Sequence, residues 1–175
     1  LGCQDMWRLS GIERDIYLYS TPKQYIADYQ VASTLDKETY TDGLFFLVTT
    51  IGGEAEGAAT LSYRLEDACG KTILEKDCPV QSKESGNFIF FEKETLPKVK
   101  RWSAEHPYLY TLIISLKDTS GEIIHLTGCN VGFRTSEIKD GRFCINGVPI
   151  LVKGANRHEH SQLGRTVSKE LMEQD

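Results

Sequence analysis

The chain has 175 residues, of which 40% are hydrophobic and 26% charged, a balance typical of a globular protein and not of a disordered one. Its net charge of −5 argues against a nucleic-acid-binding protein, because such proteins present a basic face to phosphates. No window approaches the roughly 18 consecutive apolar residues of a membrane-spanning helix, and no basic, apolar leader opens the chain.

Residues 1–20 contain a dense polar stretch, DMWRLSGIERDIYL, from Asp5 to Leu18. Its last part alternates in DIYLYS, which predicts a strand that ends before the TPK sequence. Trp7 and Arg8 could form a stacked pair. The charged side chains could equally form an exposed ion-pair network, with each pair worth about 1 kcal/mol or less. From residue chemistry alone, the exposed network is the favoured interpretation.

Residues 21–137 contain seven short windows rich in Val, Ile, Tyr, Phe and Thr, separated by turn sequences such as TDG, ACG and DTSG. Seven such strands in just over a hundred residues predict a β-sandwich of immunoglobulin type. The DTSG sequence predicts a tight hairpin. Cys69 and Cys78 are too close together for the immunoglobulin disulfide. The windows span residues 24–33, 43–51, 59–67, 71–80, 87–96, 108–118 and 122–133.

Trp102 lies in RWSAEHPYLY, directly before a strong strand, and is predicted to be a core anchor more readily than a sugar platform. The five cysteines are odd in number and include no CxxC pair, which disfavours a zinc ribbon. We expect free thiols, as in a reducing compartment. The cysteines are Cys3, Cys69, Cys78, Cys129 and Cys144.

Residues 138–175 contain GRFCINGVPILVKG (141–154), a predicted hairpin with Asn146-Gly147 at a type I′ turn. The following apolar run, VPILV, lacks alternation, as does a strand buried on both faces of a parallel sheet. A polar cluster, KGANRHEH, comes next, and then a helix start with Ser168 or Thr166 as N-cap. Strand, polar loop and helix form the opening unit of an α/β fold. In a (β/α)8 barrel, which is one such fold, the active site lies at the carboxyl ends of the strands, and the polar cluster occupies the corresponding place.

The polar cluster places His158 and His160 two residues apart, on one face of an extended backbone. Glu159 points the opposite way, so a metal centre, which needs a third ligand, is disfavoured. A solvated polar loop is the alternative to a substrate-contacting site. The position after an apolar strand, with Asn156 and Arg157 adjacent, favours the site. No nucleophile motif and no opposed pair of carboxylates is visible, so we assign no catalytic residue to this chain.

Three stretches in this order, DMWRLSGIERDIYL, WSAEHPYLYTL and VGFRTSEIKDGRFCINGVPILVKGANRHEH, closely resemble the β-galactosidases of glycoside hydrolase family 2. The resemblance implies a fragment of a longer enzyme. Residues 1–20 would be the last strands of a jelly-roll sugar-binding domain, 21–137 an immunoglobulin-like sandwich, and 138–175 the truncated start of the catalytic barrel. The fold class is therefore all-β. Both catalytic glutamates would lie later in the barrel, which makes the isolated chain inactive.

The resemblance also implies roles for three residues of the parent enzyme. His158 and Asn156, in NRHEH, would contact the galactosyl group, and Asp5, in QDMWR, would bind the galactose 6-hydroxyl and a sodium ion. Sodium and magnesium are expected in the parent, with no cofactor in the fragment. Glu13 stands where an apolar residue is expected, which bears only on local packing.

Further expectations concern partners and the competing functions. In the parent enzyme we expect a β-galactoside substrate, contacts with the remaining domains of the same polypeptide, and a homo-oligomer. We expect neither nucleic acid nor a membrane as a partner. The expected compartment is the cytoplasm, with the periplasm as the alternative. Val148 to Val152 lack their barrel neighbours in this chain, so we expect this tail to be mobile or docked on a second copy. The alternatives are a stand-alone immunoglobulin-like module that binds carbohydrate or protein, and another family 2 activity, β-glucuronidase or β-mannosidase.

Overall fold

The computed structural model describes residues 11–12, 15–53, 58–80, 88–156, 161 and 167–174. The chain divides into two compact units between Thr135 and Ser136. This division lies two residues before the boundary expected from the sequence, because the first strand of the second unit already begins at Ser136. Each unit is described by itself.

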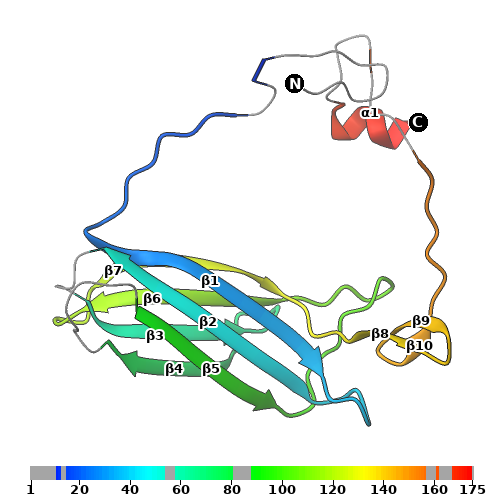
Figure 1. The fold of residues 1–175 in the computed structure, drawn as a ribbon, viewed down its shortest axis with the longest axis horizontal. Coiled ribbons are helices and arrows are strands. Elements are labelled where there is room, and N and C mark those ends of the chain that lie inside the picture. The colour runs from blue at the N-terminus through cyan, green and yellow to red at the C-terminus, as the bar shows by residue number, and fades with distance from the viewer. Residues whose placement is uncertain are drawn as a thin grey trace. The chain divides into compact units, whose positions relative to one another are not determined.

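The first unit is a sandwich of seven antiparallel strands, which confirms the predicted all-β class and the number of strands. A three-stranded sheet has the order β1-β2-β5, and a four-stranded sheet has the order β4-β3-β6-β7. The two sheets form separate layers (Figure 1). The strands are β1 (Gln24–Leu35), β2 (Gly43–Gly53), β3 (Ala58–Glu66), β4 (Thr72–Pro79), β5 (Phe88–Leu96), β6 (Tyr110–Asp118) and β7 (Ile123–Val131).

The core lies between the sheets and follows from the period of two along each strand. From Gly43 to Ile51 of β2 every second residue is buried, and on β3 and β6 the buried apolar side chains likewise stand at alternate positions. Phe45 and Tyr63 stack across the two sheets with ring centroids 6.2 Å apart. Each large apolar side chain buried in this way stabilises the fold by about 1.5–3 kcal/mol.

The fourth strand distinguishes this sandwich from the constant-type immunoglobulin arrangement. There the fourth strand joins the sheet of the first, second and fifth strands. Here β4 pairs with β3, from Thr60 opposite Pro79 to Glu66 opposite Thr72. As a result, β1 and β7 are edge strands on one side of the sandwich, and β4 and β5 are edge strands on the other.

Side chains close the side formed by β1 and β7. The Ser33 hydroxyl donates to the carbonyl of Gly132 at 2.9 Å, and the Ile26 N–H donates to Nδ1 of His125 at 3.2 Å. After β7, the Thr135 hydroxyl accepts the N–H of Leu35 at 3.0 Å. These bonds satisfy the N–H groups of Ile26 and Leu35 on β1 and the carbonyl of Gly132 after β7.

The hairpin between β6 and β7 forms at the predicted DTSG sequence. Asp118 accepts hydrogen bonds from the Ser120 hydroxyl at 2.7 Å and from the N–H groups of Ser120 and Glu122 at 2.8 and 2.9 Å. The bond from the Ser120 hydroxyl, and then that from the Glu122 N–H, lower the pKa of the Asp118 carboxyl. Gly121 has φ of 86°, which a residue with a side chain rarely adopts. The prediction of a tight hairpin is therefore confirmed.

The second unit contains a small antiparallel sheet of order β10-β9-β8, formed by β8 (Ser136–Lys139), β9 (Arg142–Ile145) and β10 (Val148–Pro149). Asn146 and Gly147 both have positive φ, 52° and 75°, as the predicted type I′ turn requires.

The apolar run after this turn is less regular than predicted. Only Val148 and Pro149 belong to a strand, and they pair with β9 in the antiparallel sense. Leu151 and Val152 are 84% and 80% exposed, and the expectation that this run is mobile or docked on a second copy stays a prediction. A strand of a parallel sheet needs parallel neighbours to bury both faces, and the described residues offer it only β9.

Residues 15–20 form no strand, and on this point the prediction from DIYLYS was wrong. All six are exposed, Ile16 and Tyr17 by more than three quarters. A strand is stabilised by a ladder with a neighbour, and the described residues supply none for this segment.

The helix α1 (Lys169–Gln174) follows the predicted N-cap, since the Ser168 hydroxyl accepts the N–H of Leu171 at 3.4 Å. A hydrogen bond from its own backbone N–H, and then one from the same Ser168 hydroxyl, lower the pKa of Glu170. Among the described helical residues there is no segment of the length and hydropathy needed to cross a membrane.

Candidate functional site

Most of the expected substrate-contacting residues fall outside the described part of the chain. Asp5 and His158 both lie outside it, as do the neighbouring residues 157–160. Asn156 is described, and it is exposed in an irregular segment, 151–156, that follows β10. Asn156 is therefore the one expected site residue that the structure places.

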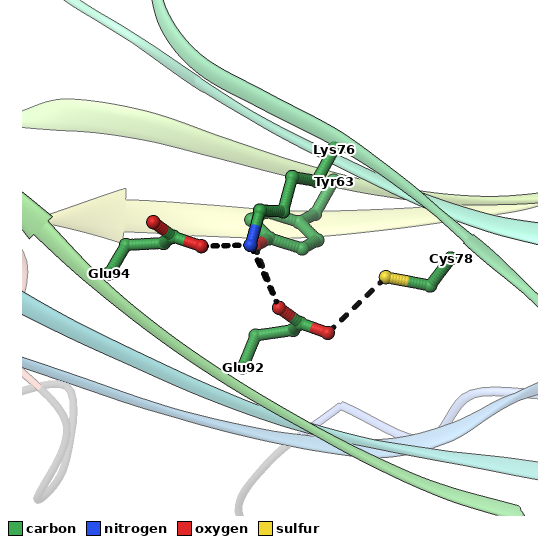
Figure 2. Close-up of polar contacts among 5 residues, drawn as sticks. All are labelled: Tyr63, Lys76, Cys78, Glu92 and Glu94. Carbon is green, nitrogen blue, oxygen red and sulfur yellow. Dashed lines mark hydrogen bonds and ion pairs between the residues drawn. The ribbon is translucent and has the colours of Figure 1, made fainter.

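A group of polar side chains lies between the edge strands β4 and β5, where the two sheets of the sandwich come together (Figure 2). We call this group the edge cluster. Its members come from three strands and project toward the space between the sheets. They are Tyr63 on β3, Lys76 and Cys78 on β4, and Glu92 and Glu94 on β5.

Strand alternation explains why these residues meet. Lys76 lies opposite Tyr63 in the β3–β4 ladder, and Cys78 follows two residues later on the same face. On β5, Glu92 and Glu94 share the face of Leu96, which is buried in the core. The charged groups therefore point inward along the open side of the sandwich.

Glu92 contacts three of the other four members of the edge cluster. It accepts hydrogen bonds from the Tyr63 hydroxyl at 3.4 Å, from Nζ of Lys76 at 3.3 Å and from Sγ of Cys78 at 3.4 Å. Lys76 also binds Glu94, so one ammonium group holds two carboxylates. The Glu92 and Glu94 side chains are about one quarter exposed, 24% and 23%.

The environment of the cluster shifts three pKa values. The hydrogen bond that Lys76 donates to Glu94 raises the pKa of Lys76. Burial, and then the negative charge of Glu92, raises the pKa of Tyr63. Burial and the hydrogen bond to Glu92 raise the pKa of Cys78 to about 11. At neutral pH the tyrosine and the thiol are therefore protonated, and Cys78 is a poor nucleophile.

This arrangement suits structural support and not glycoside hydrolysis. A glycosidase needs two carboxylates on either side of a glycosidic bond, with one of them protonated to act as the acid. Here Lys76 lies between Glu92 and Glu94, where the substrate would have to bind. Inward-pointing charges at edge strands also discourage pairing with a strand of another chain. The edge cluster closes and protects this side of the sandwich.

The sequence analysis did not identify the edge cluster. The available signal was the charged residues in LEKDC and FEKET, where strand alternation requires apolar ones. A charged residue at an inward position needs a partner from the facing sheet. That partner could not be named without knowing that β4 and β5 face each other.

Trp102 matches neither of its predicted roles fully. It is half-buried, and the Arg134 guanidinium lies over its ring at 4.7 Å from the centroid. A Cβ on Gly132 would come within 3.1 Å of the indole, so the backbone passes close beneath it. Because Arg134 covers one face of its ring, Trp102 is better described as a residue that packs against Gly132 and Arg134, directly after β7, than as a sugar platform.

The described histidines and cysteines form no metal centre. His125 accepts a backbone hydrogen bond through Nδ1, and no group of three or more His, Cys, Asp or Glu side chains within the described ranges could hold an ion. The described cysteines are free thiols, as predicted, and they are Cys69, Cys78, Cys129 and Cys144.

Solved structures share this fold. A β-glucuronidase from Parabacteroides merdae superposes with a TM-score of 0.72 at 23% sequence identity, covering 87% of this chain and 19% of its own. A β-glucuronidase from Ruminococcus gnavus gives a TM-score of 0.67 at 24% identity, covering 87% and 23%. At this identity the likeness defines the class of fold alone, that of an all-β sandwich found within larger proteins.

Sequence comparison defines the family. The model of the glycosyl hydrolases family 2 matches residues 24–134, and the model of the family 2 TIM barrel domain matches residues 136–175. The chain belongs to glycosyl hydrolases family 2.

Curated relatives are named β-galactosidase. The protein from Priestia megaterium is 42% identical over 89% of this chain, and that from Enterobacter cloacae is 37% identical over 98%. The β-galactosidase large subunit of Lactobacillus acidophilus is 34% identical over 98% of this chain. The chain spans only 15%, 17% and 26% of these three relatives, respectively.

Proposed function

We propose that this 175-residue chain is an internal part of a retaining β-galactosidase that hydrolyses terminal β-D-galactosyl groups. The observation that carries this proposal is the identity of 34–42%, over nearly the whole chain, to relatives that bear the name β-galactosidase. The match of residues 136–175 to a TIM barrel domain supports a catalytic barrel that begins here. The named β-glucuronidase structures share the fold and carry no weight on the substrate.

The proposed division of labour follows the domain order. Residues 1–20 end a sugar-binding jelly-roll domain, 21–137 form the sandwich, and 138–175 start the barrel. The sandwich acts as a scaffold between the sugar-binding and catalytic domains. The apolar core and the hydrogen bonds between β1 and the residues after β7 suit that role, because they fix the first and last strands of the sandwich relative to each other.

Three residues are proposed to contact the sugar. His158 and Asn156 would line the galactosyl subsite, and His158 would donate a hydrogen bond that strengthens as charge develops on the sugar. Asp5 would bind the 6-hydroxyl and supply an oxygen ligand to sodium. Asn156 lies in an exposed segment after β10, which is compatible with this role. The other ligands of the sodium ion would belong to the rest of the enzyme, and so would a magnesium ion and both catalytic glutamates.

The isolated chain is proposed to be inactive. Glu92 and Glu94, two carboxylates on the same face of β5, are both bound by Lys76 and point into the space between the sheets. A retaining enzyme needs one carboxylate as nucleophile and one as acid and base, with the sugar between them. The full-length protein is further proposed to be a cytoplasmic homo-oligomer.

The test compares the full-length protein with the 175-residue chain on nitrophenyl β-galactoside, β-glucuronide and β-mannoside. We expect the full-length protein to hydrolyse the galactoside preferentially and the chain to hydrolyse none. Preference for the glucuronide or mannoside would overturn the substrate assignment. Turnover by the chain itself would show that it contains catalytic carboxylates.

A further inference from the structure

A histidine holds the start of β1 against β7. The N–H of Ile26 donates to Nδ1 of His125 at 3.2 Å, across the side of the sandwich that β1 and β7 form. On β7, His125 lies opposite the fully buried Leu116, so the imidazole shares the inward face of that strand, and it is itself half-buried. The Tyr25 ring meets the imidazole edge-on, with centroids 6.4 Å apart.

The bond between Ile26 and His125 is available to only one form of the imidazole. A ring nitrogen that accepts an N–H carries no proton, so the neutral ring holds its single proton on Nε2. When the ring takes up a second proton, Nδ1 becomes a donor that faces the donor of Ile26. The bond is then lost, and a partly buried N–H is left without this acceptor.

The other side-chain bonds between β1 and the β7 region keep their form in acid. Hydroxyl groups make them, those of Tyr29, Ser33 and Thr135. Histidine is the side chain that ordinarily changes charge between pH 8 and pH 5. Acid therefore acts on the contact at the start of β1 and leaves the contacts further along the strand.

The start of β1 is also a short piece of ladder. The pairing of β1 with β2 shifts its register between Ile26 and Asp28, so only the three residues from Gln24 to Ile26 pair before the irregularity. Short strand ends of this kind open locally more readily than the centre of a sheet. A bond lost at Ile26 should therefore be felt there first.

The groups that face His125 in the described part of the chain do not favour its protonated form. Its contacts there are the Ile26 N–H and the Tyr25 ring, and neither is a carboxylate. Lys117, which follows Leu116 on β6, binds Asp77 at 3.5 Å on the outer face of the sheet and so points away from the imidazole. A carboxylate beside the ring would stabilise the protonated form and reverse the effect of acid.

We propose that His125 makes the start of β1 an acid-sensitive latch, closed at neutral pH and opened when the imidazole is protonated. The latch controls the point at which the chain enters the sandwich, directly after Lys23. Protonation and closure oppose each other, because only the neutral ring accepts the Ile26 N–H.

The experiment measures amide hydrogen exchange by mass spectrometry in the full-length protein, at pH 7.5 and pH 5.0. Rates in the peptides that cover β1 are corrected for the intrinsic effect of pH on exchange. We expect corrected exchange at the start of β1 to be about 5- to 10-fold faster at pH 5.0, because the loss of one buried bond favours local opening by that order. The centre of β2 should show no such change.

Two variants test whether the imidazole is the cause. His125→Asn keeps an acceptor oxygen close to the place of Nδ1 and takes up no proton, whereas His125→Leu removes the acceptor. We expect exchange at the start of β1 to be slow at both pH values in the first variant and fast at both in the second. His106→Asn, in the exposed connection between β5 and β6, is the matched control and should keep the response of the unsubstituted protein.

The response to acid must vanish in both variants at position 125. Its persistence in either variant would overturn the proposal, and so would equal corrected exchange of the unsubstituted protein at the two pH values. Slower exchange in acid would also overturn it, since that result would show a carboxylate beside the ring.

Discussion

The bond between Thr135 and Leu35 offers a stringent test of how the sandwich is held closed. The Thr135 hydroxyl accepts the N–H of Leu35 at 3.0 Å and donates to its carbonyl at 3.3 Å. Thr135 and Leu35 are only 6% and 1% exposed. Thr135→Val keeps the size and shape of the side chain but leaves both backbone groups of Leu35 without this partner.

The magnitude follows from the two groups left unpaired. A buried polar group without a partner costs about 1–3 kcal/mol, and the longer bond to the carbonyl is the weaker of the two. We expect the free energy of unfolding to fall by about 2–3 kcal/mol in total. At a slope of about 1.5 kcal/mol per M, the urea midpoint falls by about 1.3–2 M.

The assay is equilibrium unfolding in urea, followed by tryptophan fluorescence. Thr135→Ser keeps the hydroxyl and is expected to remain closer to the unsubstituted chain than Thr135→Val does. Thr111→Val, on the exposed outer side of β6, controls for a threonine-to-valine change as such and should shift the free energy by less than about 0.5 kcal/mol. An unchanged midpoint for Thr135→Val, or an equal loss in Thr135→Ser, would refute this reasoning.

Further substitutions test individual interactions in the sandwich. Thr49→Val should stabilise the fold by about 1 kcal/mol, because the Thr49 hydroxyl is fully buried and has no hydrogen-bond partner among the described residues; a lower urea midpoint would contradict this. Glu92→Gln removes the negative charge that raises the pKa of Cys78, so Cys78 should be alkylated faster at pH 8, with exposed Cys69 as the unaffected reference. An unchanged rate would show that Glu92 does not control the thiol. Asp36 accepts several N–H groups, which hold its pKa below the ordinary 3.8, so its stabilisation is complete above pH 3.8 and is lost as the pH falls toward the lowered value. The urea midpoints of Asp36→Asn and the unsubstituted chain should therefore differ at pH 7 and converge at low pH; a constant gap would contradict the assignment.

The sequence was sufficient to predict the number and type of strands in the sandwich. Alternating apolar residues and turn sequences indicated all seven, and the turns at Gly121 and Asn146-Gly147 formed as predicted. These signals are local, since a turn requires particular residues at its centre and a half-buried strand requires alternation.

Non-local features could not be predicted in this way. The pairing of β4 with β3, and the resulting meeting of β4 with β5, depends on which edges face each other. The edge cluster was missed for this reason, because Lys76 and Glu92 are hydrogen-bonded across two sheets. Alternation in DIYLYS predicted a strand that does not form, because alternation supplies no partner.

The candidate sugar site was inferred from resemblance and not from the chemistry of its residues. The chemistry of the residues alone favoured an exposed ion-pair network around Asp5. At His158 it did not decide between a substrate-contacting site and a solvated polar loop. The described part of the chain includes Asn156 and neither of the other two. The roles of Asp5 and His158 therefore remain predictions.

The claim that the chain is part of a larger β-galactosidase is tested most directly by reading the coding sequence beyond Asp175. A (β/α)8 barrel has about 250 residues, so we predict that strands and helices continue to alternate over most of that length, with two glutamates at the carboxyl ends of strands. A stop codon directly after Asp175 would contradict the claim and would favour an immunoglobulin-like binding module.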